Sequence, residues 1–139
     1  MQRWLRTFTT SAPAARGWRA LLVVLLAATA WLALTPLPPR AIDLGWDKLN
    51  HAGAFAALAV AGWFSVPQRR GRWPMMAGLL GYGGLIELAQ RFVPGRSGEW
   101  ADLLADALGI VAGVLIASGL AGLAGLKPRA GSPESPGSD

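Results

Sequence analysis

Long apolar runs constrain this chain more than any other feature. A transmembrane helix needs about 20 mostly apolar residues, and four such segments, at 20–37, 49–66, 73–93 and 103–126, fill most of the 139 residues. They are too long for the alternating pattern of a soluble core. The sequence therefore predicts an all-α, polytopic membrane protein with four transmembrane helices in a compact bundle.

The flanking segments set the expected domain boundaries. We expect a cytoplasmic N-terminal segment at 1–19, the four-helix membrane domain at 20–126, and a disordered cytoplasmic tail at 127–139, which is rich in Pro, Gly and Ser. The first apolar run, preceded by arginines, also resembles a cleavable signal peptide. We prefer an uncleaved helix, because the run continues past Ala30 to Leu34.

Composition excludes several function classes. The net charge of +5 could indicate nucleic acid, but the basic residues are spread over short loops, so no nucleic-acid partner is expected. The chain has no cysteine, which excludes disulfides, thiol nucleophiles and cysteine metal sites.

Charge also predicts the orientation, because Lys and Arg accumulate on the cytoplasmic side of short loops. With four spans, nine of the 13 basic residues fall on the side of both termini, which are therefore predicted to be cytoplasmic. The other four are Arg40, Lys48, Arg91 and Arg96. Six acidic residues and the single histidine lie at this outer end: Asp43, Asp47, His51, Glu87, Glu99, Asp102 and Asp106.

Helical spacing predicts that polar side chains from three helices converge near the outer surface. Residues three or four apart share a helix face. The pairs are Asp47 and His51, Glu87 and Gln90, and Asp102 and Asp106. Small residues recur every fourth position in the last helix, a stripe that allows close helix approach. These are Ala105, Gly109, Gly113, Ala117 and Ala121. Gly83 and Gly84 lie four and three residues before Glu87, so Glu87 is expected on the face that packs against a neighbouring helix.

Each polar residue has a structural explanation beside a functional one. Asp47, Glu99 and Asp102 lie near helix starts and could equally be caps. Glu87 lies toward the C-terminal end of its helix and below the outer surface, where a carboxylate is costly, so it is the strongest site candidate. Its structural alternative is a salt bridge to Arg96 or Lys48.

Histidine and arginine suggest chemistry for the cluster. His51 is the only side chain whose unperturbed pKa lies near neutrality, which suits a general acid or base, although an interhelical hydrogen bond would also explain it. A metal site from His51 with Glu87, Asp102 or Asp106 is conceivable, but no ligand spacing supports one, so no metal and no cofactor are expected. Arg96 lies in the turn at 94–98, where Ser97 is a plausible cap, and is the best cation for a phosphate.

Four motifs in one order resemble the VanZ-like family: Asp-Lys-Leu-Asn-His at 47–51, Glu-Leu-Ala-Gln at 87–90, Pro-Gly-Arg-Ser at 94–97 and Ala-Asp-Leu-Leu-Ala-Asp-Ala-Leu-Gly at 101–109. The resemblance implies a four-helix protein of the bacterial inner membrane, named for teicoplanin resistance, with proposals that such proteins act on lipid head groups or lipid-linked envelope precursors. The positions that match its polar pattern are Asp47, Lys48, His51, Glu87, Gln90, Arg96 and Asp102. Asp106 departs from it, because the family usually has Asn there.

Three hypotheses follow. In the first, Arg96, Lys48, Gln90, Asp47 and Asp106 bind an anionic lipid or lipid-linked precursor, and Glu87, His51 and Asp102 handle protons or a nucleophile. In the second, the protein is a non-enzymatic envelope accessory or antibiotic-resistance protein whose polar cluster binds a partner or joins the helices. A proton-linked transporter is disfavoured, because no polar path continues to the cytoplasmic side. The pattern does not fix enzymatic activity or the oligomeric state.

Overall fold

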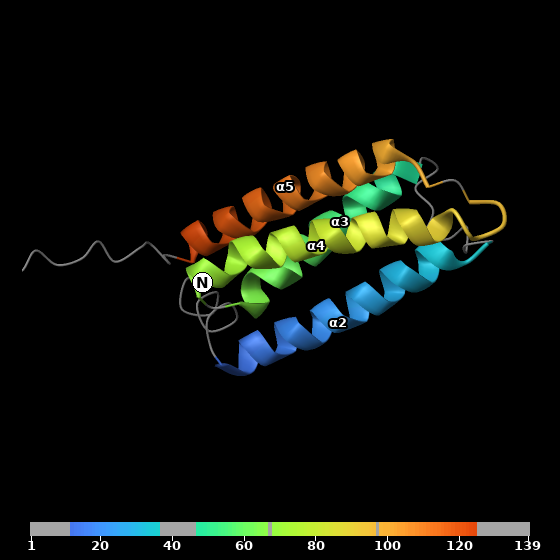
Figure 1. Cartoon of the computed structure of the whole chain (residues 1–139). Helices are drawn as coiled ribbons and strands as arrows, with labels where there is room; N and C mark the ends of the chain where they lie inside the picture. Colours follow the sequence, from blue (N-terminus) through green and yellow to red (C-terminus); the bar gives the residue numbers. More distant parts are fainter. Residues whose placement is uncertain (1–11, 37–46, 67, 97, 125–139) are drawn as a thin grey trace, which may run out of the picture.

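Four helices make up the described part of the chain. The computed structural model describes residues 12–36, 47–66, 68–96 and 98–124. Its helices are α2 (Ala12–Leu34), α3 (Asp47–Ser65), α4 (Arg69–Gln90) and α5 (Trp100–Leu123), and no strand occurs among these residues. The predicted all-α class is confirmed. Figure 1 shows that successive helices run in alternating directions, so α3 and α5 begin where α2 and α4 end.

The helix bounds differ from the predicted apolar segments in a systematic way. Every helix begins earlier than its apolar run, and α2 begins at Ala12, within the segment expected to precede the first span. Each helix also ends one to three residues before the predicted end. Hydropathy marks the apolar stretch, whereas the bounds of a helix are set by its backbone hydrogen bonds, which here begin in the polar flank before the stretch and stop before its end. Residues 1–11 and the predicted tail at 127–139 lie outside the described residues.

Helix α5 packs closely against α3 along the predicted small-residue stripe. Gly109 and Gly113 are buried, and a Cβ added to either would collide with the backbone carbonyl of Ala52 or Ala56 on α3. A Cβ at Gly113 would also lie 2.7 Å from that of Ala59. The stripe thus lets the two backbones approach one another directly, as small residues do in membrane helix pairs.

Helix α2 joins the bundle by a smaller apolar contact and by hydrogen bonds between side chains and backbone carbonyls. Leu22 belongs to the core cluster with Phe55 and Leu58 of α3. The Tyr82 hydroxyl of α4 donates to the Leu26 carbonyl at 2.6 Å, and the Arg19 Nε donates to the Ser65 carbonyl at 3.1 Å. The core therefore lies between all four helices but is centred on α3.

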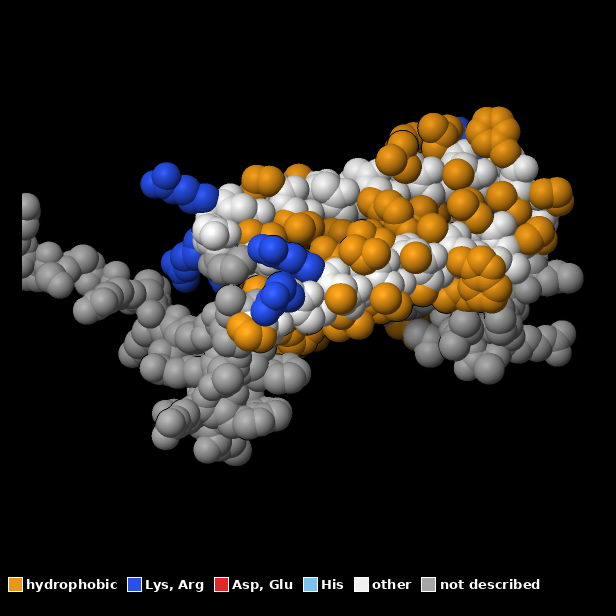
Figure 2. All heavy atoms as spheres, turned by 90° about the horizontal axis from the view of Figure 1, so that it is seen from below, with side chains coloured by type: hydrophobic (Ala, Val, Ile, Leu, Met, Phe, Trp, Pro, Cys, Tyr) orange, Lys and Arg blue, Asp and Glu red, His pale blue; other side chains and the backbone are white. Residues whose placement is uncertain are grey.

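Apolar side chains cover much of the outer surface. Figure 2 shows them along the length of the bundle, while Lys and Arg gather chiefly at one end. Large examples more than half exposed include Val23, Leu85, Leu115 and Leu123. In the described part, the stretches Pro13–Leu34 and Trp100–Leu123 are long and apolar enough to cross a membrane. An exposed apolar surface of this kind suits lipid better than water.

Candidate functional site

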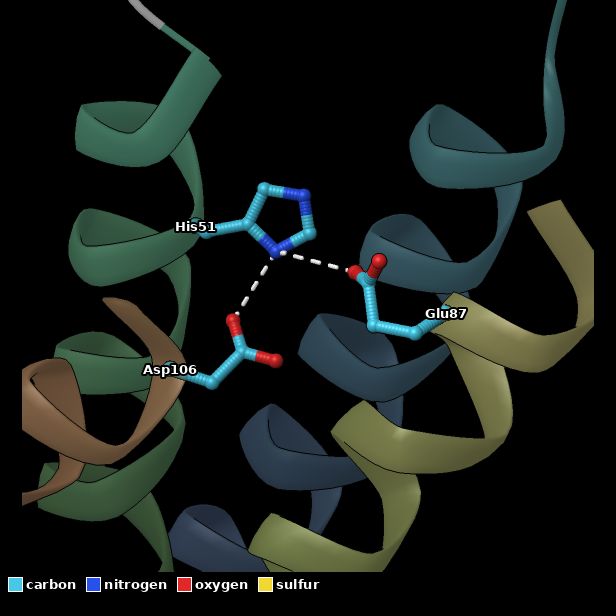
Figure 3. Close-up of side chains that lie close together, drawn as sticks. All are labelled: His51, Glu87 and Asp106. Atoms are coloured by element: carbon cyan, nitrogen blue, oxygen red, sulfur yellow. Dashed lines mark hydrogen bonds and ion pairs between the residues drawn. The ribbon is translucent and has the colours of Figure 1, made fainter. Parts of the chain in front are cut away.

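Three ionisable side chains meet at the end where α3 and α5 begin and α4 ends. His51 comes from α3, Glu87 from α4 and Asp106 from α5, and Figure 3 shows them pointing toward one another. The Nδ1 atom of His51 lies 2.9 Å from Oδ1 of Asp106 and 3.7 Å from Oε1 of Glu87. The predicted convergence of three helices on one polar cluster is therefore present for these three residues.

The cluster is buried, and two of its oxygens have no hydrogen-bond partner. His51, Glu87 and Asp106 are 9%, 7% and 0% exposed. Oε1 of Glu87 and Oδ2 of Asp106 are both fully buried without a hydrogen bond. Burying a carboxylate oxygen without a partner costs free energy, so the cluster would lower the stability of the fold if it had only a structural role. A buried oxygen without a hydrogen bond needs an explanation, and a bound water, ion or ligand is one.

Local features fix where the two carboxylates lie. Gly83 is buried on α4 one turn before Glu87, and a Cβ there would collide with Oδ2 of Asp106, so glycine makes room for that carboxylate. The other oxygen of Glu87, Oε2, accepts a hydrogen bond of 3.0 Å from the backbone N–H of Glu99. Glu99 immediately precedes α5, where the helix dipole favours a negative charge. Glu87 is thereby anchored on the far side from His51.

A second group of charges lies beside the cluster and joins α3 to α5. The Lys48 ammonium is 3.2 Å from Glu99 and 3.4 Å from Asp102, whose side chain is 2% exposed. Glu99 is the N-cap residue of α5, but its side chain makes no capping hydrogen bond. Asp102, predicted as a catalytic residue with His51 and Glu87, is paired with Lys48, and Asp106, predicted as a ligand-binding residue, lies beside His51.

Two other predicted site residues turn toward α2. The Arg96 guanidinium donates to the backbone carbonyls of Leu32 at 2.9 Å and Thr35 at 3.3 Å. Gln90 donates to the Ala33 carbonyl at 3.1 Å. Both side chains thus satisfy carbonyls at the C-terminal end of α2, which have no partner within the helix. The Asp47 side chain and the predicted cap Ser97 lie outside the described residues.

A groove of about 280 Å³ opens beside the cluster. Glu87 reaches it, and so do residues that the sequence analysis did not assign to a site. The lining consists of Gly84, Glu87, Leu88, Arg91, Gly98, Glu99, Trp100 and Leu103. The four-span topology had placed Arg91 on the outer side, and its spacing of four residues from Glu87 was a signal that the sequence analysis did not use. Glu87 is the one residue of the His51, Glu87 and Asp106 cluster that also lines the groove.

The cluster also has the donor types of a metal site. One ligand atom each from His51, Glu87 and Asp106 can be chosen so that all lie within 4.8 Å of one another. The expectation of no metal relied on the lack of a ligand motif within one segment. The lack of such a motif does not argue against a metal site here, because the three donors come from three separate helices.

Fold and site together define a helical membrane protein with a buried ionisable site near one end of its bundle. A family model described as VanZ/LLP1 matches residues 5–122, and the chain belongs to this family. The resemblance to VanZ-like proteins noted in the sequence is therefore confirmed. No curated protein and no solved structure matches the chain.

Proposed function

We propose that this chain is a multi-pass protein of the bacterial inner membrane that binds, at its outer face, a lipid head group or a lipid-linked envelope precursor. The observation that carries the proposal is Glu87, which is buried at 7% exposure, has an unsatisfied Oε1 atom beside His51, and also lines the open groove. Ionisable groups at such depth usually mark a ligand path or a reactive centre. The family is consistent with an envelope role.

Helix dimensions support four spans. The helices have 19 to 24 residues, which at 1.5 Å per residue gives lengths of about 28–36 Å, close to the thickness of the hydrocarbon core. Alternating directions place the starts of α2 and α4 at the same end. Arg16, Arg69 and Arg70 lie at this end, which the positive-inside rule assigns to the cytoplasm. The His51 cluster then faces the outside.

The groove suggests how an amphipathic ligand would bind. Leu88, Trp100 and Leu103 offer apolar contacts for an acyl chain, while Arg91 offers a cation for a phosphate. His51, Glu87 and Asp106 would contact the head group from within the bundle. Arg91 thus replaces Arg96 as the proposed phosphate ligand, since Arg96 is engaged by α2.

Variants of the cluster test this proposal in cells. His51→Ala and Glu87→Gln should shift lipid and cell-wall precursor profiles, and glycopeptide susceptibility, in the same direction as deletion of the gene. Glu134→Gln is the matched control, because it makes the same carboxylate-to-amide change beyond the family match. Membrane levels of each variant are measured in parallel.

A non-enzymatic accessory role is the alternative, in which the cluster only joins the helices. The Lys48 pairs to Glu99 and Asp102 favour it, because they already link α3 to α5 through charge. If the two variants accumulate normally and behave as wild type while deletion does not, the ligand-binding proposal fails. Degradation of both variants would favour the structural role.

A further inference from the structure

We infer that His51, Glu87 and Asp106 form a binding site for one divalent transition-metal ion, with Zn²⁺ as the best-fitting case. The inference goes beyond the proposed lipid function, because it depends only on the three side chains and their surroundings. An imidazole nitrogen with two carboxylate oxygens is a donor set that suits zinc and related ions. Mg²⁺ and Ca²⁺ prefer oxygen ligands throughout.

The donor spacing fits a tetrahedral ion. Zinc binds nitrogen and carboxylate oxygen at about 2.0–2.2 Å, so neighbouring ligands in a tetrahedron lie about 3.3–3.6 Å apart. The His51 Nδ1 atom is 2.9 Å from Asp106 Oδ1 and 3.7 Å from Glu87 Oε1. These two distances lie on either side of the required spacing, and one ligand atom from each of the three residues lies within 4.8 Å of the others.

Unsatisfied oxygens provide an independent argument. Oε1 of Glu87 faces His51 but lacks a hydrogen bond, and Oδ2 of Asp106 is likewise buried without one. A single hydrogen bond from His51 to Asp106 leaves both oxygens without a partner. A metal ion bound through Oδ1 of Asp106 would also satisfy Oε1 of Glu87, which the lone imidazole does not do.

The charge of the region points to a cation as well. Four acidic side chains, Glu87, Glu99, Asp102 and Asp106, lie around this end of the bundle. The Lys48 ammonium is already shared between Glu99 and Asp102, and the Arg96 guanidinium donates to α2 carbonyls. Arg91 lines the groove, but inside the cluster an anionic head group would meet the carboxylates of Glu87 and Asp106. A divalent ion would neutralise the two carboxylates that bind it and would offer an open coordination position to a phosphate.

The surroundings have the features of a metal site that can take an external ligand. The Glu99 N–H holds the second oxygen of Glu87 at 3.0 Å, which orients the carboxylate as outer-shell hydrogen bonds commonly do. Three protein ligands leave at least one position open on a tetrahedral ion. Glu87 also lines the groove, so the groove is the side from which an ion or a phosphate would approach this carboxylate.

Calorimetric titration of the full chain with Zn²⁺ tests the inference. The protein is purified in detergent, stripped with a chelator, and titrated; metal content is measured after dialysis. Wild type should bind one Zn²⁺, and His51→Ala and Asp106→Asn should each bind it at least tenfold more weakly, a loss comparable to or larger than that from outer-shell changes. Glu99→Gln is the charge-matched control, because its carboxylate pairs with Lys48 and lies outside the ligand set. It should change affinity by only a few-fold, through its screened charge.

Failure of wild type to bind stoichiometric Zn²⁺ would overturn the metal site. The same Zn²⁺ affinity in His51→Ala, Asp106→Asn and the control Glu99→Gln would also overturn it. Elution as a single folded species on size exclusion qualifies each variant for comparison. If wild type does not bind Zn²⁺, the metal inference fails, but the proposed lipid binding is measured separately and is not affected. Conversely, Zn²⁺ binding without any bound lipid would contradict only the proposed function.

Discussion

Gly83 controls the approach of Asp106 to the cluster at the scale of a single residue. It is buried on α4, and the space that a side chain would fill is occupied by the Asp106 carboxylate and, at 3.1 Å, by the Phe55 ring. Any side chain at this position has to move α5 or turn Asp106 away from His51. The glycine is therefore as necessary to the site geometry as the three ionisable residues.

Gly83→Ala should lower the free energy of unfolding by about 1–3 kcal/mol, the usual cost of overpacking a tight contact. The measurement is denaturant-induced unfolding of the purified protein in one detergent. Gly81→Ala is the control on the same helix, because a Cβ there meets nothing within 4 Å. It should be neutral or stabilising by up to about 1 kcal/mol through helix propensity. Equal effects of the two substitutions would show that the Asp106 contact is unimportant.

Single residues also show how far sequence reasoning reaches. His51, Glu87 and Asp106 were all named in advance, because helical spacing and predicted depth placed them on inner faces at one level. Arg96 and Gln90 were assigned to the ligand, but both donate to α2 carbonyls. Spacing within a helix indicates which face a side chain occupies. It does not indicate which other helix lies opposite that face, so the contacts of Arg96 and Gln90 with the end of α2 were not predicted.

At the scale of the elements, the α3–α5 contact positions the site. Two of the three clustered residues, His51 and Asp106, come from these helices, and their distance of 2.9 Å depends on the close approach at Gly109 and Gly113. Gly113→Ala should therefore lower the thermal unfolding midpoint of the protein. Gly119→Ala, where a Cβ meets nothing within 4 Å, should not lower it. Equal midpoints for the two variants would contradict this packing.

Helix α2 depends on polar contacts at its C-terminal end. Arg96 donates to the carbonyls of Leu32 and Thr35 in or just after its last turn. Arg96→Ala should therefore increase amide hydrogen exchange at 31–36 by destabilising that turn, while exchange in α5 stays unchanged. Mass spectrometry of peptides from the exchanged protein measures this. Arg70→Ala, exposed at the opposite end, is the control; an equal increase in both variants would contradict the contact.

Helix number, order and the small-residue stripe could be predicted because each depends on local composition. The helix bounds could not be predicted as well, because each helix starts in the polar residues before its apolar stretch and ends before that stretch does. The groove was also beyond sequence reasoning. It requires Arg91 at the end of α4 and Trp100 at the start of α5 to face the same space, and that depends on how the chain turns between them.

At the scale of the whole molecule, orientation decides which compartment the site meets. The chain has no cysteine, so single cysteines can report on sidedness without a background. Phe92→Cys, which replaces a residue 82% exposed just after α4, should react with a membrane-impermeant thiol reagent applied from outside. Gln68→Cys, just before α4, should react only from the cytoplasmic side. The reverse pattern would place the His51 cluster in the cytoplasm and contradict the proposed function.

The whole account depends on one claim, that the buried cluster and its groove hold a phosphate-bearing lipid or lipid-linked precursor. Native mass spectrometry of the gently purified protein measures this most directly, because a bound lipid keeps its own mass and can be identified after release. Wild type should carry one such molecule, and His51→Ala and Glu87→Gln, purified identically and equally folded, should lose it. The same lipid adducts on wild type and both variants, or none on wild type, would contradict the account.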